Sequence, residues 1–213
     1  MPTTTPRDRY REQVRTEAKS IAWEQIGASG ASGLSLNAIA KQMGVSGPAL
    51  YRYFAGRDEL MTELISDAYT DIAAALRAAA VREKDDRKRP AAVANGLRTW
   101  AKRNPHRYLL VWGTPVPGYE APQTTTDAAR KAMAVLLETF AALDVAKGRD
   151  ALQDDALSGE WAPGTSPRTR RRALAFWTRV HGFVSLEICG HFNGMGFDPD
   201  ALFAAEVGTL HEV

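Results

Sequence analysis

The chain has 213 residues, 45% of them hydrophobic and 24% charged, which is typical of a folded globular protein and excludes a chain-wide disordered or fibrous structure. The formal net charge is only +2, but residues 1–57 hold eight lysines and arginines against four acidic residues, whereas residues 58–213 hold 19 against 21. A basic N-terminal end suits contact with a phosphate backbone, where Lys and Arg displace condensed counterions.

Targeting signals and disulfides are not indicated by the sequence. The N-terminal residues MPTTTPRDRYREQVR are polar and basic, and no segment approaches the roughly 18 uninterrupted apolar residues that a membrane span needs. The single cysteine, Cys189, excludes an internal disulfide and suits a reducing compartment. We therefore expect a cytoplasmic protein that does not enter a membrane.

The first predicted element is an amphipathic helix from Asp8 to Ala28. Its apolar residues recur at three-to-four-residue spacing, as Val14, Ala18, Ile21, Ala22 and Ile26. A run of Gly, Ala and Ser over residues 27–33 then ends the helical pattern.

Two short helices with a glycine between them follow. Ser35 offers a hydroxyl as N-cap for a helix over residues 36–43, and Pro48 opens another that runs to Phe54. Two closely crossing helices need a small residue on the first, a turn residue able to adopt positive φ, and apolar residues that fix the second. These places are taken by Ala40, Gly44, Val45 and Leu50, with Ile39 adding a core contact. Residues 35–54 therefore predict a helix-turn-helix, whose second helix can enter the DNA major groove.

Helical patterns continue to the C-terminal end. Asp58 can cap a long fourth helix, and residues 113–126 form a proline- and glycine-rich loop. Longer helices are predicted at about 127–143 and 168–192, and a short one opens at Asp198. No alternating segment of strand length is present. The predicted fold is all-α, with a three-helix helix-turn-helix head followed by a helical body.

The stretch from Val14 to Leu64 resembles the DNA-binding head of the TetR family of transcriptional regulators, most closely in GVSGPALYRYFAGRDEL at residues 44–60. That family follows its recognition helix with an aromatic pair, a turn, a basic residue and a new helix. The matching residues here are Tyr51, Tyr53, Phe54, Arg57 and Asp58. The resemblance implies a DNA-binding domain over residues 12–72, with its motif at 35–54, and a C-terminal domain over residues 86–213.

The resemblance also implies contacts with the phosphates of double-stranded operator DNA. Ser35 and Ser46 would donate to phosphates, helped by the positive ends of their helix dipoles. Tyr51 and Arg57 would contact phosphates as well. A flexible N-terminal arm would add electrostatic attraction through Arg7, Arg9 and Arg11.

Base reading would fall to the start of the recognition helix. The residues Gly47, Pro48 and Ala49 lack long polar side chains, so they would approach the bases closely and contact thymine methyl groups. Arg52 would be the polar reader. Two roles are equally expected for Tyr53, which could lie at the edge of the core or contact the DNA backbone. Leu50 and Phe54 are expected in the core.

Three segments of the body resemble the TetR subgroup named for a Trp-His-Gly signature. They are NPHRY at 104–108, WGTPVPGYEAP at 112–122, and Trp177 with His181 and Gly182. The resemblance implies that a small-molecule effector binds inside the helical body, in a largely aromatic site. The candidates, each equally a candidate for plain core packing, are Trp100, Tyr108, Trp112, Tyr119, Phe176, Trp177, His181 and Phe183. The identity of the effector is not indicated by any residue.

A homodimer is the third implication. The helices predicted at 127–143 and 168–192 would form the isologous four-helix interface usual in this family, since the second is apolar on more than one side. The candidates for this interface are Met133, Leu136, Leu137, Phe140, Val180, Val184 and Ile188. A dimer suits an operator with two half-sites.

The predicted function is therefore a dimeric repressor released from its operator by a small molecule. An enzyme is disfavoured, because no nucleophile elbow, phosphate-binding loop or paired carboxylates are present. A metal or redox sensor using Cys189, His181 and His191 is also disfavoured. Cys189 and His191 are two residues apart, so on a helix their side chains point in different directions and chelate a metal ion poorly. No metal and no cofactor are expected. A helical protein that binds a small molecule without binding an operator stays open as the alternative.

Overall fold

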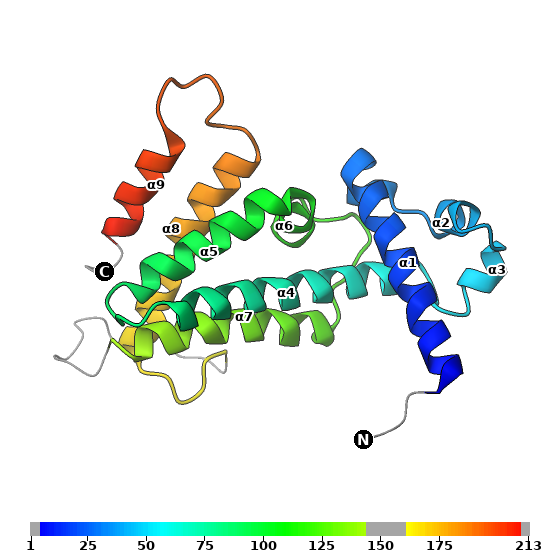
Figure 1. The fold of residues 1–213 in the computed structure, drawn as a ribbon, viewed down its shortest axis with the longest axis horizontal. Helices are drawn as coiled ribbons and strands as arrows, with labels where there is room; N and C mark the ends of the chain where they lie inside the picture. Colours follow the sequence, from blue (N-terminus) through cyan, green and yellow to red (C-terminus); the bar gives the residue numbers. More distant parts are fainter. Residues whose placement is uncertain (1–4, 144–160, 210–213) are drawn as a thin grey trace. The chain divides into compact units, whose positions relative to one another are not determined.

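The computed structural model describes residues 5–143 and 161–209, and within them every regular element is helical (Figure 1). The elements are α1 (Pro6–Ser29), the 3-10 turn η1 (Ala31–Gly33), α2 (Leu36–Gln42), α3 (Gly47–Leu50), α4 (Arg57–Arg82), α5 (Arg89–Arg103), α6 (Pro105–Trp112), α7 (Gln123–Ala141), α8 (Pro167–Ile188) and α9 (Pro199–Gly208). The all-α fold expected from the sequence is confirmed.

Proline and a polar cap mark where several of these helices begin. Proline lies in the first turn of α1, α3, α5, α8 and α9, where its missing N–H has no intrahelical partner to lose. The side chains of Thr5, Ser166 and Asp198 accept backbone N–H groups at the starts of α1, α8 and α9. Local sequence therefore sets these helix starts.

The N-terminal arm predicted to be flexible is helical instead. Thr5 and Asp8 form a reciprocal capping box and Pro6 follows the cap, so α1 starts two residues earlier than expected. The exposed side chains of Arg7, Arg9 and Arg11 consequently lie on the first turns of a helix. Any contact they make with DNA would be made from a helical backbone.

The recognition helix is shorter than predicted. Helix α3 ends at Leu50, and residues 51–53 continue as a turn in which the Phe54 N–H donates to the Leu50 carbonyl at 3.2 Å. The aromatic residues there have modest helix propensity, and Phe54 is fully buried. Asp58 is not the cap of α4, since it lies inside the first turn, and the Glu59 carboxylate instead accepts the N–H of Ala55.

Two compact units make up the chain. The first comprises residues up to Ala68 together with His106–Thr126, and the second comprises Tyr69–Pro105 and the residues from Asp127 onward. Residues 106–126, which the sequence assigns to the C-terminal domain, cluster with the head by their contacts, and the predicted domain boundaries stay a prediction. The Arg107 guanidinium lies 4.9 Å from the Trp23 ring of α1, and the hydroxyls of Thr62 and Tyr119 are 3.0 Å apart.

The core of the first unit lies where α1, α2 and the start of α4 meet. Its fully buried apolar residues include Ala18, Ala22, Ile39, Ala40, Leu50, Phe54, Leu60, Met61 and Leu64. Leu50 and Phe54 are thus core residues, as expected. Val45 is not, because 40% of its surface is exposed. Leu50 is the buried apolar residue of α3.

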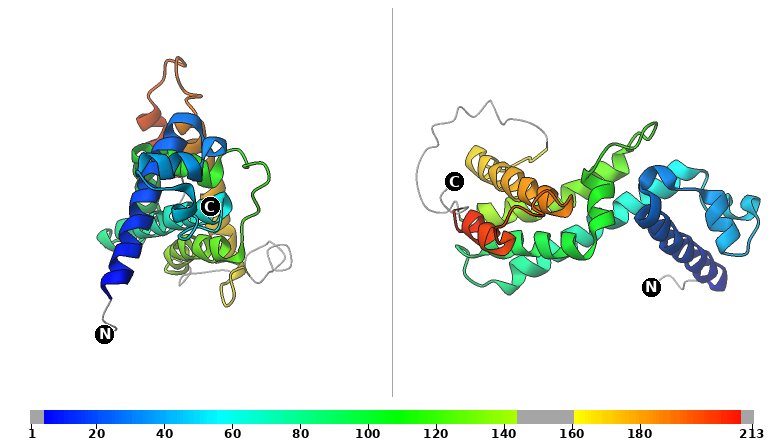
Figure 2. Two further views of the ribbon diagram at one scale, coloured as in Figure 1. Left: turned by 90° about the vertical axis from the view of Figure 1, so that its right-hand side faces the viewer. Right: turned by 90° about the horizontal axis from the view of Figure 1, so that it is seen from above.

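In the second unit, α5, α8 and α9 lie side by side (Figure 2). The Arg77 side chain of α4 forms an ion pair with Glu138 of α7 at 3.1 Å. Phe140 of α7 packs edge-on against Phe176 of α8, with the ring centroids 5.5 Å apart. Among the described helices, none is both long and apolar enough to cross a membrane.

Candidate functional site

The turn between α2 and α3 has the geometry that the sequence predicts. Gly44 has φ +69°, a conformation that side chains other than glycine rarely adopt. The Ser35 hydroxyl caps α2 by accepting the N–H of Ala38 at 3.3 Å. The two helices approach closely, because a Cβ at Gly47 would lie 3.1 Å from the Asn37 amide oxygen. A side chain at the first position of α3 would require the exposed Asn37 side chain to move by a few tenths of an ångström.

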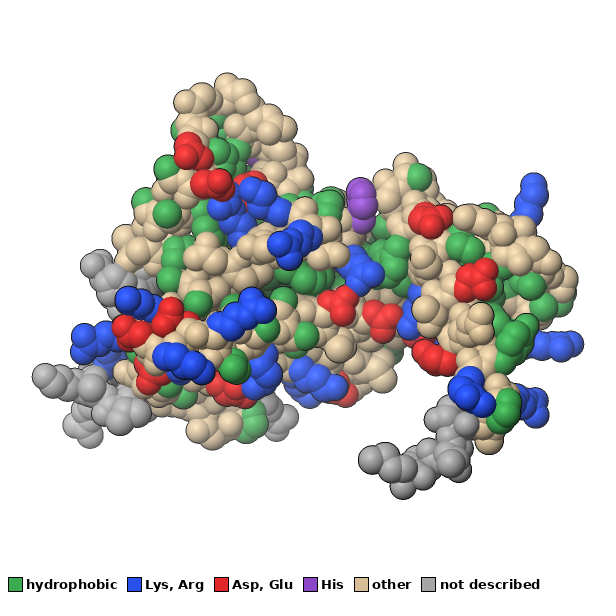
Figure 3. All heavy atoms as spheres, viewed as in Figure 1, with side chains coloured by type: hydrophobic (Ala, Val, Ile, Leu, Met, Phe, Trp, Pro, Cys, Tyr) green, Lys and Arg blue, Asp and Glu red, His purple; other side chains and the backbone are tan. Residues whose placement is uncertain are grey.

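The start of α3 presents polar and small groups at the surface. Ser46 and Pro48 are exposed, Gly47 and Ala49 are half-buried, and the Ser46 side chain makes no capping hydrogen bond. Beyond the helix, Arg52 is exposed and Tyr51 is 47% exposed. Tyr53 is half-buried, at the edge of the core. Lys and Arg side chains also project from the surface of α1 to α3 (Figure 3).

Arg57 has a different environment from the one predicted. Its Nε donates to the Leu34 carbonyl at 3.2 Å, and its Nη2 donates to the Ala31 carbonyl at 3.0 Å. The guanidinium therefore ties the start of α4 to the segment just before α2. Two of its five N–H donors are thereby used on main-chain oxygens inside the head, and the phosphate contact implied by the resemblance stays a prediction.

The sequence did not predict a role for Arg15 of α1. Its guanidinium donates to the carbonyl of Tyr53, forms an ion pair with Glu63 of α4, and lies 4.6 Å from the centre of the Phe54 ring. One turn further along, Lys19 forms an ion pair with Asp67 at 2.8 Å. The available signal was a pair of basic residues four apart at the edge of the apolar stripe of α1.

Comparison with known proteins decides the family. Residues 20–64 match the family described as bacterial regulatory proteins, tetR family, and residues 90–210 match the tetracyclin repressor-like C-terminal domain. The chain belongs to the TetR family. It is a transcriptional regulator with a helix-turn-helix DNA-binding domain, in a family whose members bind operator DNA and small-molecule ligands. The finer subgroup with the Trp-His-Gly signature stays a prediction.

Relatives extend over almost the whole chain. The HTH-type transcriptional regulators Rv1816 of Mycobacterium tuberculosis and Mb1846 of Mycobacterium bovis are each 34% identical over 94% of this chain and 92% of their own. The crystal structure of the regulatory protein SCO4313 is 54% identical, with a TM-score of 0.87 over 97% of this chain and 98% of that one. FadR of Bacillus subtilis, solved with stearoyl-CoA, shares the fold at 14% identity, with a TM-score of 0.66 over 92% of this chain and 96% of that one.

The aromatic residues predicted for the TetR effector site fall into both units. Tyr108, Trp112 and Tyr119 belong to the first unit, where the Tyr108 and Trp112 rings are 4.9 Å apart. The second unit contains Trp100, Phe176, Trp177, His181 and Phe183. In the second unit, Phe176 and Phe183 pack against other phenylalanines of the core. The Trp177 and His181 rings are stacked 5.2 Å apart, and burial lowers the pKa of His181.

Two grooves in the second unit are lined mostly by residues other than those predicted for the effector site. One of about 600 Å³ lies along α4 and α5 and includes Trp100, together with small residues such as Ala75 and Gly96. Another of about 670 Å³ is lined by α7 and residues 161–169, including Leu137 and Trp161. The first contains one of the eight predicted effector residues and the second contains none. Neither groove therefore brings the predicted set together.

Four of the seven residues predicted for the dimer interface are unavailable to a partner. Leu136, Phe140, Val180 and Val184 are 0–3% exposed within the single chain, because α7 and α8 use them to pack their own subunit. Met133, Leu137 and Ile188 keep partly exposed side chains. The helical periodicity located an apolar face, but that face covers the subunit's own core.

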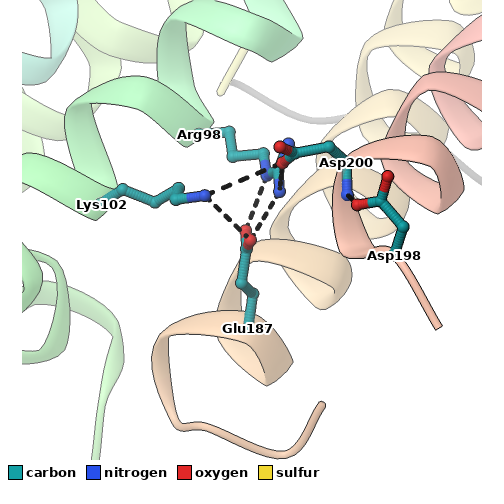
Figure 4. Close-up of polar contacts among 5 residues, drawn as sticks. All are labelled: Arg98, Lys102, Glu187, Asp198 and Asp200. Carbon is teal, nitrogen blue, oxygen red and sulfur yellow. Dashed lines mark hydrogen bonds and ion pairs between the residues drawn. The ribbon is translucent and has the colours of Figure 1, made fainter. Parts of the chain in front are cut away.

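An ion-pair cluster joins α5, α8 and α9 (Figure 4). The Arg98 guanidinium donates to both carboxylate oxygens of Glu187 at 2.7 and 2.6 Å and to Asp200 at 2.5 Å. These bonds lower the pKa values of both carboxyl groups, and Lys102 lies 3.4 Å from Glu187. Arg98 also lies 4.8 Å from the centre of the Phe203 ring. The cluster holds α9 against the other two helices.

The described residues near Cys189 do not form a metal site. Helix α8 ends at Ile188, so Cys189 is its C-cap and His191 lies beyond it. No group of three His, Cys, Asp or Glu side chains within residues 5–143 and 161–209 is placed to hold a metal ion.

Proposed function

We propose that this TetR-family regulator is a homodimeric repressor that binds its operator through α2 and α3 and leaves it when a small molecule binds the body. The observation that carries the proposal is the exposed start of α3, fixed beside α2 by the left-handed turn at Gly44. A recognition helix needs such a start, because its N-terminal residues meet the base edges.

The proposed DNA contacts rest on residue type and on position at the starts of α2 and α3, with exposed side chains at Ser46, Pro48, Tyr51 and Arg52. Hydroxyl groups of Ser35, Ser46 and Tyr51 would bond phosphates, which fix the position of the protein on the duplex. Gly47, Pro48 and Ala49 are small enough to bring the backbone close to the bases. Arg52 would be the polar base reader, and the half-buried Tyr53 would be a weaker contact. Arg57 is left out, since it holds main-chain carbonyls.

The test is selection of a binding sequence from randomised duplex DNA by the full chain, followed by affinity measurements. Arg52→Ala should lower affinity for the selected sequence about tenfold and relax preference at one or two base pairs. Arg130→Ala is the matched control, because it removes an equally charged, exposed side chain from α7. If Arg52→Ala and Arg130→Ala behave alike, Arg52 is not a reader. If the wild type enriches no sequence, operator binding itself is wrong.

For the dimer we propose the exposed faces of α8 and α9 in place of the buried ones. Leu186 and Leu202 are 46% and 38% exposed, and Ala201, Ala204 and Ala205 of α9 are exposed as well. A helix that is apolar on nearly all sides needs cover from more than its own subunit. These two helices can therefore pair across a twofold axis into an isologous four-helix interface.

Two charged substitutions separate this interface from the one predicted on α7. Leu202→Glu should produce monomers in sedimentation equilibrium, whereas Leu137→Glu, a matched change on α7, should leave the dimer intact. The reverse result would place the interface on α7. A wild-type chain that sediments as a monomer would contradict the homodimer.

A ligand can release the protein from DNA only if the ligand binds the DNA-free conformation of the protein more tightly than the DNA-bound one. Helix α4 is the proposed lever, because it runs without a break from the first unit into the second. By reciprocity, operator DNA must weaken effector binding by the same factor by which the effector weakens DNA binding. Calorimetry with a compound found by thermal-shift screening tests this. Equal compound affinity with and without operator would contradict the proposed mechanism of release.

A further inference from the structure

Two arginines outside the helix-turn-helix hold main-chain carbonyl groups at its two ends. Arg57 bonds the carbonyls of Ala31 and Leu34 just before α2, and Arg15 bonds the carbonyl of Tyr53 just after α3. The motif between them has only seven residues in α2 and four in α3. Helices this short are unstable alone, so their orientation depends on such tertiary contacts.

Arg15 is the more informative of the two, because its partners lie on three segments. The Arg15 side chain projects from α1 and is 17% exposed. Its guanidinium donates to the Tyr53 carbonyl in the turn after α3 and forms an ion pair with Glu63 of α4. The carboxylate of Glu59 lies 3.8 Å from the guanidinium. The Phe54 ring beneath the guanidinium limits where it can move. The carbonyl of Tyr53 is therefore coupled to the carboxylate of Glu63 through one planar, rigid group.

We propose that Arg15 is a positioning residue for operator recognition: it sets the orientation of the turn that follows α3 and ties that orientation to α4. It does this without contacting DNA. The proposal rests on the proposed function, in which the start of α3 meets the bases.

The consequence for binding can be separated from that of a phosphate contact. Base contacts depend on orientation, whereas the salt dependence of binding counts the phosphates neutralised. Loss of a positioning residue should therefore lower affinity for the selected sequence, leave affinity for unrelated DNA unchanged, and leave the slope of log K against log salt unchanged. Loss of a phosphate contact would weaken binding to all DNA and make that slope shallower.

The experiment uses the full chain with Arg15→Gln and Arg15→Lys. The matched control is Lys19→Gln, since Lys19 pairs with α4 from the same face of α1 at 2.8 Å from Asp67 and also lies 3.7 Å from Glu63. The probes are the duplex selected by the wild type and a shuffled duplex. We expect Arg15→Gln to bind the selected duplex about tenfold more weakly, as for one lost base contact, with the shuffled duplex unaffected. Arg15→Lys should recover part of the loss, because it keeps the charge but not the fork geometry.

A second readout does not need DNA. Hydrogen exchange of the amides of residues 49–54 should be faster in Arg15→Gln than in Lys19→Gln at matched distance from each variant's melting temperature. Three results would overturn the proposal: equal loss of affinity in both variants, a shallower salt slope for Arg15→Gln, or unchanged exchange at residues 49–54. Failure of the proposed function is distinguishable, since it appears as a wild type that selects no sequence.

Discussion

The first and second units use arginine in different ways. In the DNA-binding head, Arg15 and Arg57 donate to main-chain carbonyls and so position segments that are too short to hold themselves. In the body, Arg98 bonds the carboxylates of Glu187 and Asp200 and joins helices of 15, 22 and 10 residues. Loss of a head arginine should therefore mainly disturb geometry and DNA binding. Loss of Arg98 leaves the carboxylate of Glu187, whose side chain is 13% exposed, without its main partner and should mainly lower stability.

Arg98→Met should have the largest effect on stability. Removing one partner of a buried ion pair costs about 3–5 kcal/mol, and we expect the lower end because Lys102 still reaches Glu187. The free energy of urea unfolding measures this. Lys102→Met is the control and should cost less than about 1 kcal/mol, since that side chain is half-exposed. Equal losses of unfolding free energy from both substitutions would mean that Arg98 stabilises the fold no more than the half-exposed Lys102 does.

Gly44→Val tests the head without removing any contact. Gly44 has φ +69° and open space where a Cβ would lie, so the penalty is backbone strain of about 1–3 kcal/mol. Gly44→Asn should cost less, because asparagine tolerates the left-handed region. Both are measured by thermal unfolding together with affinity for the selected duplex. An unchanged melting temperature in the valine variant would show that the turn relaxes without cost.

Arg57→Ala distinguishes a main-chain clamp from a phosphate contact. We expect a loss of about 1 kcal/mol in unfolding free energy, below the usual value for charged hydrogen bonds because the side chain is partly exposed. The salt slope of DNA binding should stay unchanged. A slope shallower by about one phosphate, with normal stability, would restore the phosphate role that the sequence suggested.

The smallest expected effect comes from pH. Burial lowers the pKa of His181, so the unfolded chain binds a proton more readily than the folded one. The stability linked to this histidine is fully present above its ordinary pKa of about 6.5 and is lost as pH falls through its lowered folded pKa. His181→Phe should flatten the dependence of unfolding free energy on pH below about 6.5. An identical pH dependence in the variant and the wild type would contradict this assignment.

The sequence predicted the head well because its signals are local. A cap at Ser35, a glycine turn at residue 44 and buried Leu50 and Phe54 follow from spacing and residue type alone. The direction of the Arg57 side chain could not be predicted in this way, because its partners are 23 and 26 residues away. Local spacing also gave no partner for Arg15, whose carbonyl acceptor is 38 residues distant.

The body was harder to predict because periodicity shows that a face is apolar but not what covers it. Leu136, Phe140, Val180 and Val184 are apolar in the expected register, yet they pack within the subunit. Residues 106–126 lie inside the range that matches the C-terminal domain, yet Arg107 contacts Trp23 and Tyr119 contacts Thr62, which could not be predicted from the sequence. Which long-range neighbour each face meets depends on tertiary packing rather than on neighbouring residues.

Hydroxyl-radical footprinting of the full wild-type chain on its selected duplex tests the central claim most directly, because it reports both the two heads and the DNA contact in one measurement. A dimer that reads major grooves through α2 and α3 should protect two half-sites on one face of the duplex, with centres about 34–36 Å or a multiple of one helical turn apart. Protection should weaken steeply as salt is raised. A single protected patch, or protection that is independent of salt, would contradict the account.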